Sequence, residues 1–390
     1  MRQADVDVLD RPAVLGRRTD WDSRVSFSDF AAPDDGTIHS IAWSPDGSRL
    51  AVTTFAQTAD LGGSHGDGRV AIVNLEAQTE ERRLDAKPIM ATGALEWSPS
   101  GDYIAILEAG RIGIWDVVRG VMRTEISTGI AAPIAFSWNR QTADVAMVVI
   151  DHSRSAVVLL RASEDMDFNE NREIPTDATQ GHPMSVGWSP DGQRLAAVSV
   201  DRDDRYTLNV WEDPSEETMP TSVSLGRGIV EGLDLTRAWA PNGQSLALAI
   251  EPLTLVSSTP SARSDELIED ATLALWDRSE LRTQSFDEEG LDVFGAAWSP
   301  DGRWISISTG DDLLFLSAST LGVVDIAPTF FTAVLGPTRG GEDDDLGLSG
   351  FTTLGFTICH CWAPSSRQVA VGNVGGLRIL DVRALKAPND

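Results

Sequence analysis

Residues Trp188–Val198 read Trp-Ser-Pro-Asp-Gly-Gln-Arg-Leu-Ala-Ala-Val and set a pattern that recurs along the whole chain. An alternating apolar run leads into the tryptophan, a Ser-Pro-Asp-Gly turn follows, and a second apolar run leaves the turn. Glycine accepts the positive φ that such a turn needs, so the stretch predicts two short strands joined as a hairpin. Related units occur at Trp43, Trp97, Trp138, Trp239, Trp298 and Trp362, although the copy at Trp138 lacks the Pro-Asp-Gly turn.

The spacing of the units identifies the repeat. Successive unit tryptophans are 41 to 64 residues apart, a period typical of a propeller blade with four strands. Downstream of each unit an apolar strand ends in Trp-Asp or a related pair, most clearly at Trp115-Asp116 and Trp276-Asp277. The repeat therefore predicts an all-β, seven-bladed β-propeller of four-stranded blades.

These two landmarks resemble the WD40-repeat family, in a bacterial-type form with degenerate repeats, over roughly residues 36–385. Only Gly181-His182 matches the Gly-His dipeptide that opens the family's repeats, so the family's buried His–Ser–Asp–Trp hydrogen-bond network is not carried over to this chain. The resemblance implies a non-catalytic scaffold that binds other proteins. Function rarely follows from fold alone, however.

The domain organisation follows from the ends of the repeat. We expect a flexible arm over residues 1–21, a single propeller over 22–385 and a short tail over 386–390. The last blade offers strands at Ile358–Trp362, Gln368–Val371 and Leu377–Val382, and its fourth strand is missing. We predict that residues 24–30 supply this strand and close the ring, which removes exposed strand edges.

Three long connections give the strongest functional indication. With the strands of a blade called a to d, Phe55–Gly68 and Glu251–Asp270 are long b–c connections, and Thr329–Phe356 is a long d–a connection. All three emerge on one face, where a rigid scaffold can present variable loops. The candidate partner-binding residues of this face, which include the b–c hairpin of blade 4, are His65, Asp67, Arg69, Asp203, Arg205, Glu266, Glu269, Arg339, Glu342, Asp343, Asp344 and Asp345.

Composition narrows the partners. The formal net charge is −28 and the pI is about 4.4, so nucleic-acid binding is disfavoured, because phosphate contacts need clustered basic residues. We expect protein partners with a basic surface, steered by the acidic groups. The sequence contains no apolar run of membrane-spanning length, and its first residues lack the apolar core of a signal peptide. A cytoplasmic protein that is a monomer on its own is the expectation.

No catalytic, cofactor-binding or metal-binding residue is predicted, and the chain is not expected to be an enzyme. Cys359-His360-Cys361 is the one cysteine–histidine cluster, but zinc would need four ligands and no second pair exists. Buried cysteines on an inner strand are the more economical interpretation. Asp201–Arg205 lacks the spacing of a calcium loop, and His65 lies among glycines that disfavour a preorganised site.

Two alternatives stay open beside the scaffold. One is an enzyme or small-molecule sensor of the TolB- or lactonase-like kind that uses the central channel; polar side chains converging there around a metal would favour it. The other is a regulator controlled by proteolysis in a signalling or defence system. That alternative rests on the long insertions, including the acidic segment Gly340–Asp345, and one specific cut in them would support it.

Overall fold

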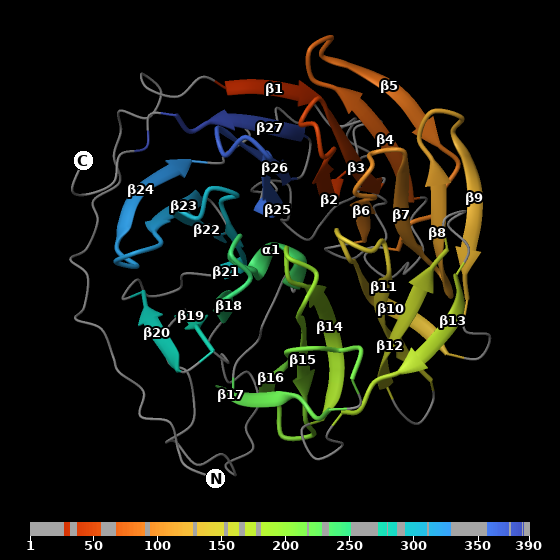
Figure 1. Ribbon diagram of the computed structural model, residues 1–390. Coiled ribbons are helices and arrows are strands. Elements are labelled where there is room, and N and C mark those ends of the chain that lie inside the picture. The colour runs from red at the N-terminus through yellow and green to blue at the C-terminus, as the bar shows by residue number, and fades with distance from the viewer. Residues whose placement is uncertain are drawn as a thin grey trace, which may run out of the picture.

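The computed structural model of the 390-residue chain describes residues 27–31, 37–55, 68–89, 94–127, 131–151, 155–163, 168–176, 181–216, 218–227, 234–250, 272–278, 280–286, 293–309, 312–328, 357–373, 376–383 and 385. Seven antiparallel sheets are arranged as blades around a common centre (Figure 1). Among the described residues six sheets have four strands, and the sheet of the fifth blade along the chain has three. The predicted seven-bladed, all-β propeller is therefore confirmed.

The blades follow one another along the chain. Blade 1 contains β2 (Thr37–Trp43), β3 (Arg49–Phe55), β4 (Gly68–Asn74) and β5 (Thr79–Leu84); blade 2 contains β6 (Leu95–Trp97), β7 (Tyr103–Glu108), β8 (Arg111–Asp116) and β9 (Val121–Ile126). Blade 3 contains β10 (Ala132–Trp138), β11 (Val145–Ile150), β12 (Ser155–Ala162) and β13 (Phe168–Glu173); blade 4 contains β14 (His182–Trp188), β15 (Leu195–Val200), β16 (Arg205–Trp211) and β17 (Thr221–Arg227). Blade 5 contains β18 (Leu246–Ile250), β19 (Thr272–Trp276) and β20 (Leu281–Ser285), preceded by α1 (Leu235–Ala238); blade 6 contains β21 (Val293–Trp298), β22 (Trp304–Thr309), β23 (Asp312–Ser317) and β24 (Val323–Pro328). Blade 7 contains β25 (Thr357–Trp362), β26 (Gln368–Asn373) and β27 (Gly376–Asp381) together with β1 (Phe27–Ala31).

The first strand of the chain completes the last blade. β1 pairs antiparallel with β27, with Phe27 opposite Leu380 and Ala31 opposite Gly376, and the two strands lie side by side in Figure 1. The predicted ring closure is confirmed, with the strand ending one residue later than expected. Residues 24–26 of the predicted strand lie outside the described residues. Pairing the two ends of the propeller removes an open sheet edge at the point where the ring begins.

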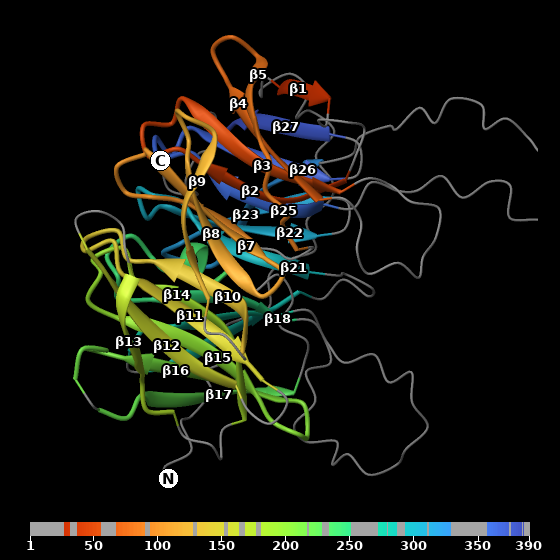
Figure 2. The same cartoon turned by 90° about the vertical axis from the view of Figure 1, so that its right-hand side faces the viewer.

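The ring has two faces. In the side view of Figure 2 the strands run across the thickness of the ring, so that successive turns lie at alternate ends. The a–b and c–d turns form what we call the turn face, and the b–c and d–a connections form the connection face. The strand ends that flank the three long insertions lie on the connection face, and the insertions themselves are outside the described residues.

The repeated turn explains its own sequence. In blade 4 the Ser189 hydroxyl donates to the Asp191 carboxylate at 2.5 Å and accepts from the Arg194 amide at 2.9 Å. Gly192 has a φ of 69°, which a residue with a side chain adopts at a cost. Blades 1 and 6 repeat the same serine–aspartate contact. The Ser-Pro-Asp-Gly unit therefore contains the residues that form a complete hydrogen-bonded turn.

The unit tryptophans join one blade to the next. Their side chains are buried at Trp43, Trp97, Trp138, Trp188, Trp239 and Trp362. The Trp97 indole donates to the carbonyl of Ala42 at 3.0 Å, and the Trp239 indole donates to the carbonyl of Gly187 at 3.0 Å. Each acceptor comes directly before the unit tryptophan of the preceding blade. The repeat thus supplies the apolar side chains that pack between blades and an indole–carbonyl hydrogen bond that links neighbouring blades.

Blade 5 departs from the repeat. The pattern predicts an innermost strand leading into Trp239. For the described residues this prediction is wrong, because Leu235–Ala238 form α1 and Trp239 makes an isolated bridge to Leu246. Asp234 caps the helix, its carboxylate accepting from the Thr236 amide at 3.2 Å. A capping aspartate favours a helical turn over pairing of the segment as a strand, and contacts with other blades stabilise that turn.

Candidate functional site

The short helix α1 lies at the centre of the ring (Figure 1). Leu235 packs against Gly187 in β14, where a side chain on the glycine would come within 2.5 Å of the Leu235 backbone. The Thr236 hydroxyl is 2.6 Å from Oε1 of Glu96 in β6 and 3.2 Å from Oγ of Ser137 in β10. One turn of helix therefore contacts the innermost strands of blades 2, 3 and 4.

Arg237 extends these contacts to the other side of the ring. Its Nε is 2.9 Å from the Asp234 carboxylate, and one Nη donates to the carbonyl of His360 in β25 at 2.6 Å. The other Nη donates to the carbonyl of Ile41 in β2. α1 also packs against β21 of blade 6. It therefore contacts the innermost strands of all six remaining blades. α1 therefore occupies the centre of the ring, and the side chains of Thr236 and Arg237 have partners on the surrounding blades.

Glu96 is the most perturbed carboxyl group of this centre. Burial raises its pKa from 4.5 to about 7, and the negative charge of Asp234 acts in the same direction. The Thr236 hydroxyl, the Trp138 amide and the charge of Arg140 oppose the increase, while the guanidinium of Arg237 is also close enough to interact. Glu96 therefore changes protonation near neutral pH inside the contact that holds α1.

A glutamine at this position is expected to remove a pH dependence of stability. The folded state keeps the Glu96 proton between pH 4.5 and about 7 while the unfolded chain releases it, so this group's contribution is present below pH 4.5 and is lost as the pH rises to 7. The loss amounts to at most about 3 kcal/mol. Glu96→Gln mimics the protonated form, so we expect nearly equal stability of the two proteins at pH 4 and a more stable variant at pH 8.

Denaturant unfolding of both proteins across this pH range checks the prediction. The difference between the two curves of stability against pH reports on Glu96, because both proteins contain His360. The pKa of His360 is lowered to about 3 by burial and by Arg237, so its contribution to stability is lost as the pH falls, opposite to that of Glu96. A difference that stays constant with pH would contradict the assignment.

The cysteine–histidine cluster is structural. Cys359 and Cys361 are free and buried, and burial raises their pKa values to about 12 and 11. His360 is buried, and its Nε2 lies 2.8 Å from the hydroxyl of Ser306, which also accepts from the Trp362 indole at 2.8 Å. The prediction of buried cysteines on an inner strand is confirmed. Thiols with raised pKa values are poor nucleophiles.

The predicted partner-binding residues are only partly covered by the described chain. Arg69 is exposed at the start of β4, and Asp203 is exposed between β15 and β16. Arg205 begins β16, with its Nη1 3.8 Å from the Asp203 carboxylate. The structure thus brings Asp203 and Arg205 together, whereas Arg69 belongs to blade 1. His65, Asp67, Glu266, Glu269, Arg339, Glu342, Asp343, Asp344 and Asp345 lie outside the described residues.

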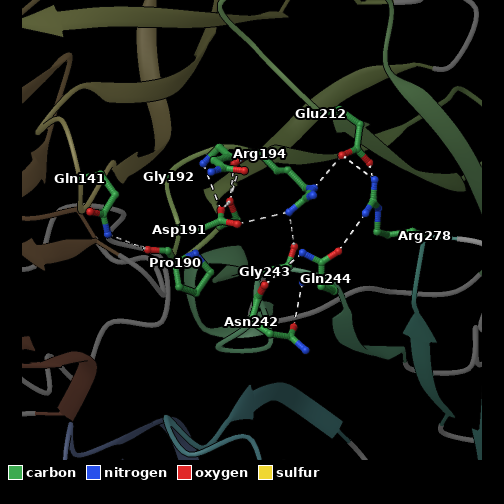
Figure 3. A network of polar contacts seen from close by, with 12 residues as sticks. Gln141, Pro190, Asp191, Gly192, Arg194, Glu212, Asn242, Gly243, Gln244 and Arg278 are labelled. Carbon is green, nitrogen blue, oxygen red and sulfur yellow. Dashed lines mark hydrogen bonds and ion pairs between the residues drawn. The ribbon is translucent and has the colours of Figure 1, made fainter.

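A polar network on the turn face was not anticipated from the sequence (Figure 3). Arg194, which is 8% exposed, donates to Glu212 at 2.7 Å and to the carbonyl of Gly243 at 3.0 Å. Arg278 of blade 5 donates to the same Glu212 carboxylate at 3.0 Å. The network ties the turns of blades 4 and 5 together. Its only sequence signal is the arginine that follows the Ser-Pro-Asp-Gly turn, which blade 1 also has at Arg49.

The turn face also contains a cavity between blades 3 and 4, of about 940 Å³. Its walls come from the a–b turns of both blades, the end of β12, the outer strand β13 and the c–d connection of blade 4. Sequence reasoning placed no site here, because residues from five separate segments form it. Within the described chain no group of three or more His, Cys, Asp or Glu side chains is placed to hold a metal ion.

Comparisons with known proteins agree with the fold. No known family model matches the chain. Hydrazine synthase from Kuenenia stuttgartiensis is similar in structure, with a TM-score of 0.66 and 13% identity over 90% of this chain and 97% of that one. The β-propeller domain of Cps50 (Swd1) from Myceliophteria thermophila has a TM-score of 0.62 and 16% identity over 92% of this chain and 100% of that one.

At these identities the likeness concerns the architecture alone. The fold and the comparisons define the class of the protein, a seven-bladed β-propeller. No helix in the described ranges is long and apolar enough to cross a membrane.

Proposed function

We propose that the chain is a non-catalytic, WD40-like scaffold that binds protein partners on its connection face. The observation that carries this proposal is the position of α1. Thr236 and Arg237 fill the centre of the ring and are bound to groups of the surrounding blades. This arrangement leaves the faces and the rim for recognition and gives less support to an enzyme or sensor that uses the channel.

The chemistry of the connection face favours a partner with basic groups. The net charge of −28 attracts cationic surfaces at low salt, and Asp203 is an exposed acidic residue on this face in blade 4. The acidic residues of the long connections, from Glu266 to Asp345, would extend the same surface. We place the complex in the cytoplasm, where the two free thiols Cys359 and Cys361 would stay reduced.

Replacing the longest connection tests the proposal. We expect a variant in which residues 329–356 become a short Gly-Ser turn to fold and to lose a partner that the wild type captures from host lysate. A control variant replaces residues 164–167 on the turn face with Gly-Ser and should retain the partner. Capture is measured by quantitative mass spectrometry, and folding by thermal unfolding. Equal capture by all three proteins would contradict the choice of face.

A further inference from the structure

The four-residue helix α1 depends on its neighbours for its conformation. A single helical turn is unstable on its own, because nucleation fixes several residues for one hydrogen bond. Two of its side chains, Leu235 and Ala238, are buried apolar groups. The other two, Thr236 and Arg237, are held by hydrogen bonds and an ion pair. The position of α1 therefore depends on polar contacts, whose strength changes when a charge changes.

The C-terminal end of α1 is anchored separately from the rest. Trp239 is buried, forms a bridge with Leu246 and donates its indole N–H to the carbonyl of Gly187 at 3.0 Å. The bridge has the register of a regular blade, in which Trp188 lies opposite Leu195. A movement about Trp239 can consequently take α1 out of the centre without unpairing blade 5.

Glu96 contacts α1 and blade 3 at the same time. Its Oε1 accepts from the Thr236 hydroxyl at 2.6 Å, and its Oε2 accepts from the Trp138 amide at 2.8 Å. The hydroxyl oxygen of Ser137 lies 3.2 Å from that of Thr236 and accepts from the Trp188 amide at 3.0 Å. Glu96 and Thr236 are each partly exposed, so protons reach this cluster without unfolding of the ring.

The charge of the cluster depends on Glu96. Asp234 and Arg237 form an ion pair at 2.9 Å, so their charges cancel. Arg140, exposed at the a–b turn of blade 3, is a further cation that acts on Glu96. Burial shifts the pKa values of the titratable groups on β2 and β25 away from the charged form, and these groups are His39, Cys359, His360 and Cys361. Ionised Glu96 therefore places a second carboxylate beside Asp234, whereas protonated Glu96 adds no charge.

We propose that α1 is a releasable plug whose retention in the centre of the ring is controlled by the charge of Glu96. The neutral carboxyl group binds Thr236 without opposing Asp234. The carboxylate repels Asp234 and competes with it for Arg237, so ionisation favours movement of α1 away from the centre. Release would free the two carbonyl groups of β2 and β25 that Arg237 binds. The switch does not depend on the partner surface proposed on the connection face.

Hydrogen–deuterium exchange of the full chain, measured by mass spectrometry on peptides that contain residues 234–240, tests the proposal. Glu96→Gln keeps a carbonyl oxygen for the Trp138 amide and a donor for Thr236, so it should hold α1 at every pH. Wild-type Glu96 has a pKa of about 7 in the held state and 4.5 when released, so protonation favours the held state below pH 4.5 and this effect is lost as the pH rises to 7. Compared with Glu96→Gln at the same pH, the α1 amides of the wild type should exchange at least about tenfold faster at pH 7.5 and within about twofold at pH 4.5.

Two further variants separate the charge of Glu96 from other effects. Glu125→Gln is the matched control, because it makes the same change at an exposed side chain of blade 2, and its α1 should exchange like that of the wild type. Asp234→Asn keeps a capping side chain and removes the negative charge beside Glu96, so the increase in exchange should begin at lower pH.

Peptides from β16 distinguish release of α1 from unfolding of the ring. Leu208 at the centre of this strand is 0% exposed, and its amide should remain protected while α1 exchanges. Equal exchange of α1 in the wild type and Glu96→Gln across the pH range would overturn the proposal. Exchange of α1 only together with β16 would also overturn it, even if the two proteins differ in global stability.

Discussion

Arg237→Ala is expected to lower the free energy of unfolding by about 3–5 kcal/mol, the usual cost of removing one partner from a buried ion pair. The side chain of Arg237 is 18% exposed, and that of Asp234 is 12% exposed. The substitution leaves the Asp234 carboxylate without its counter-ion and the carbonyls of Ile41 and His360 without their donor. Chemical denaturation of the purified protein measures the loss.

A surface arginine gives the matched control for this prediction. Arg83 pairs with Glu80 at 2.9 Å, with side chains that are 40% and 33% exposed. Arg83→Ala should cost less than about 1 kcal/mol, because solvent screens the pair. Similar losses for the two substitutions would show that α1 does not connect the blades as described.

Gly187→Ala is expected to displace α1 from the centre and to cost at least about 1–3 kcal/mol, the range for overpacking a filled core. A Cβ at this position would lie 2.5 Å from the carbonyl carbon of Leu235 and 2.6 Å from its Cβ. Both contacts are too short, and the backbone of α1 can relieve them only by moving. The same displacement would weaken the bonds of Thr236 and Arg237.

Thermal or chemical unfolding tests this substitution against Gly322→Ala. An added Cβ at Gly322 meets nothing closer than the Thr320 hydroxyl at 3.4 Å, so we expect little change there. Gly187→Ala combined with Arg237→Ala should destabilise by less than the sum of the single changes, since both act on α1. Strict additivity would indicate that the two residues act independently.

The ring itself was predictable from sequence because its determinants are local and repeated. The Ser189–Asp191 turn uses residues within one unit, and each unit carries its own tryptophan to pack against a neighbour, so seven similar units predict seven similar blades. Ring closure was predictable by a different argument. The last blade lacked one strand, and an alternating segment near the N-terminus was the available partner for β27.

The centre of the ring was not predictable because its determinants are distant. Leu233 and Leu235 alternate with Asp234 and Thr236, which is a strand pattern. The segment forms α1 because Asp234 caps it, Gly187 leaves room for Leu235, and Glu96 binds Thr236 from 140 residues away. The cavity between blades 3 and 4 escaped prediction for the same reason, since its lining residues come from five separate segments of the chain.

Cross-linking of the captured partner tests the scaffold account most directly. A carboxylate-reactive dihydrazide suits this chain, which has 59 acidic residues, and mass spectrometry then locates each link. For a partner whose capture depends on residues 329–356, the account predicts links to Asp203 and to the acidic residues of the long connections. Links confined to the outer strands or to the turn face would contradict it.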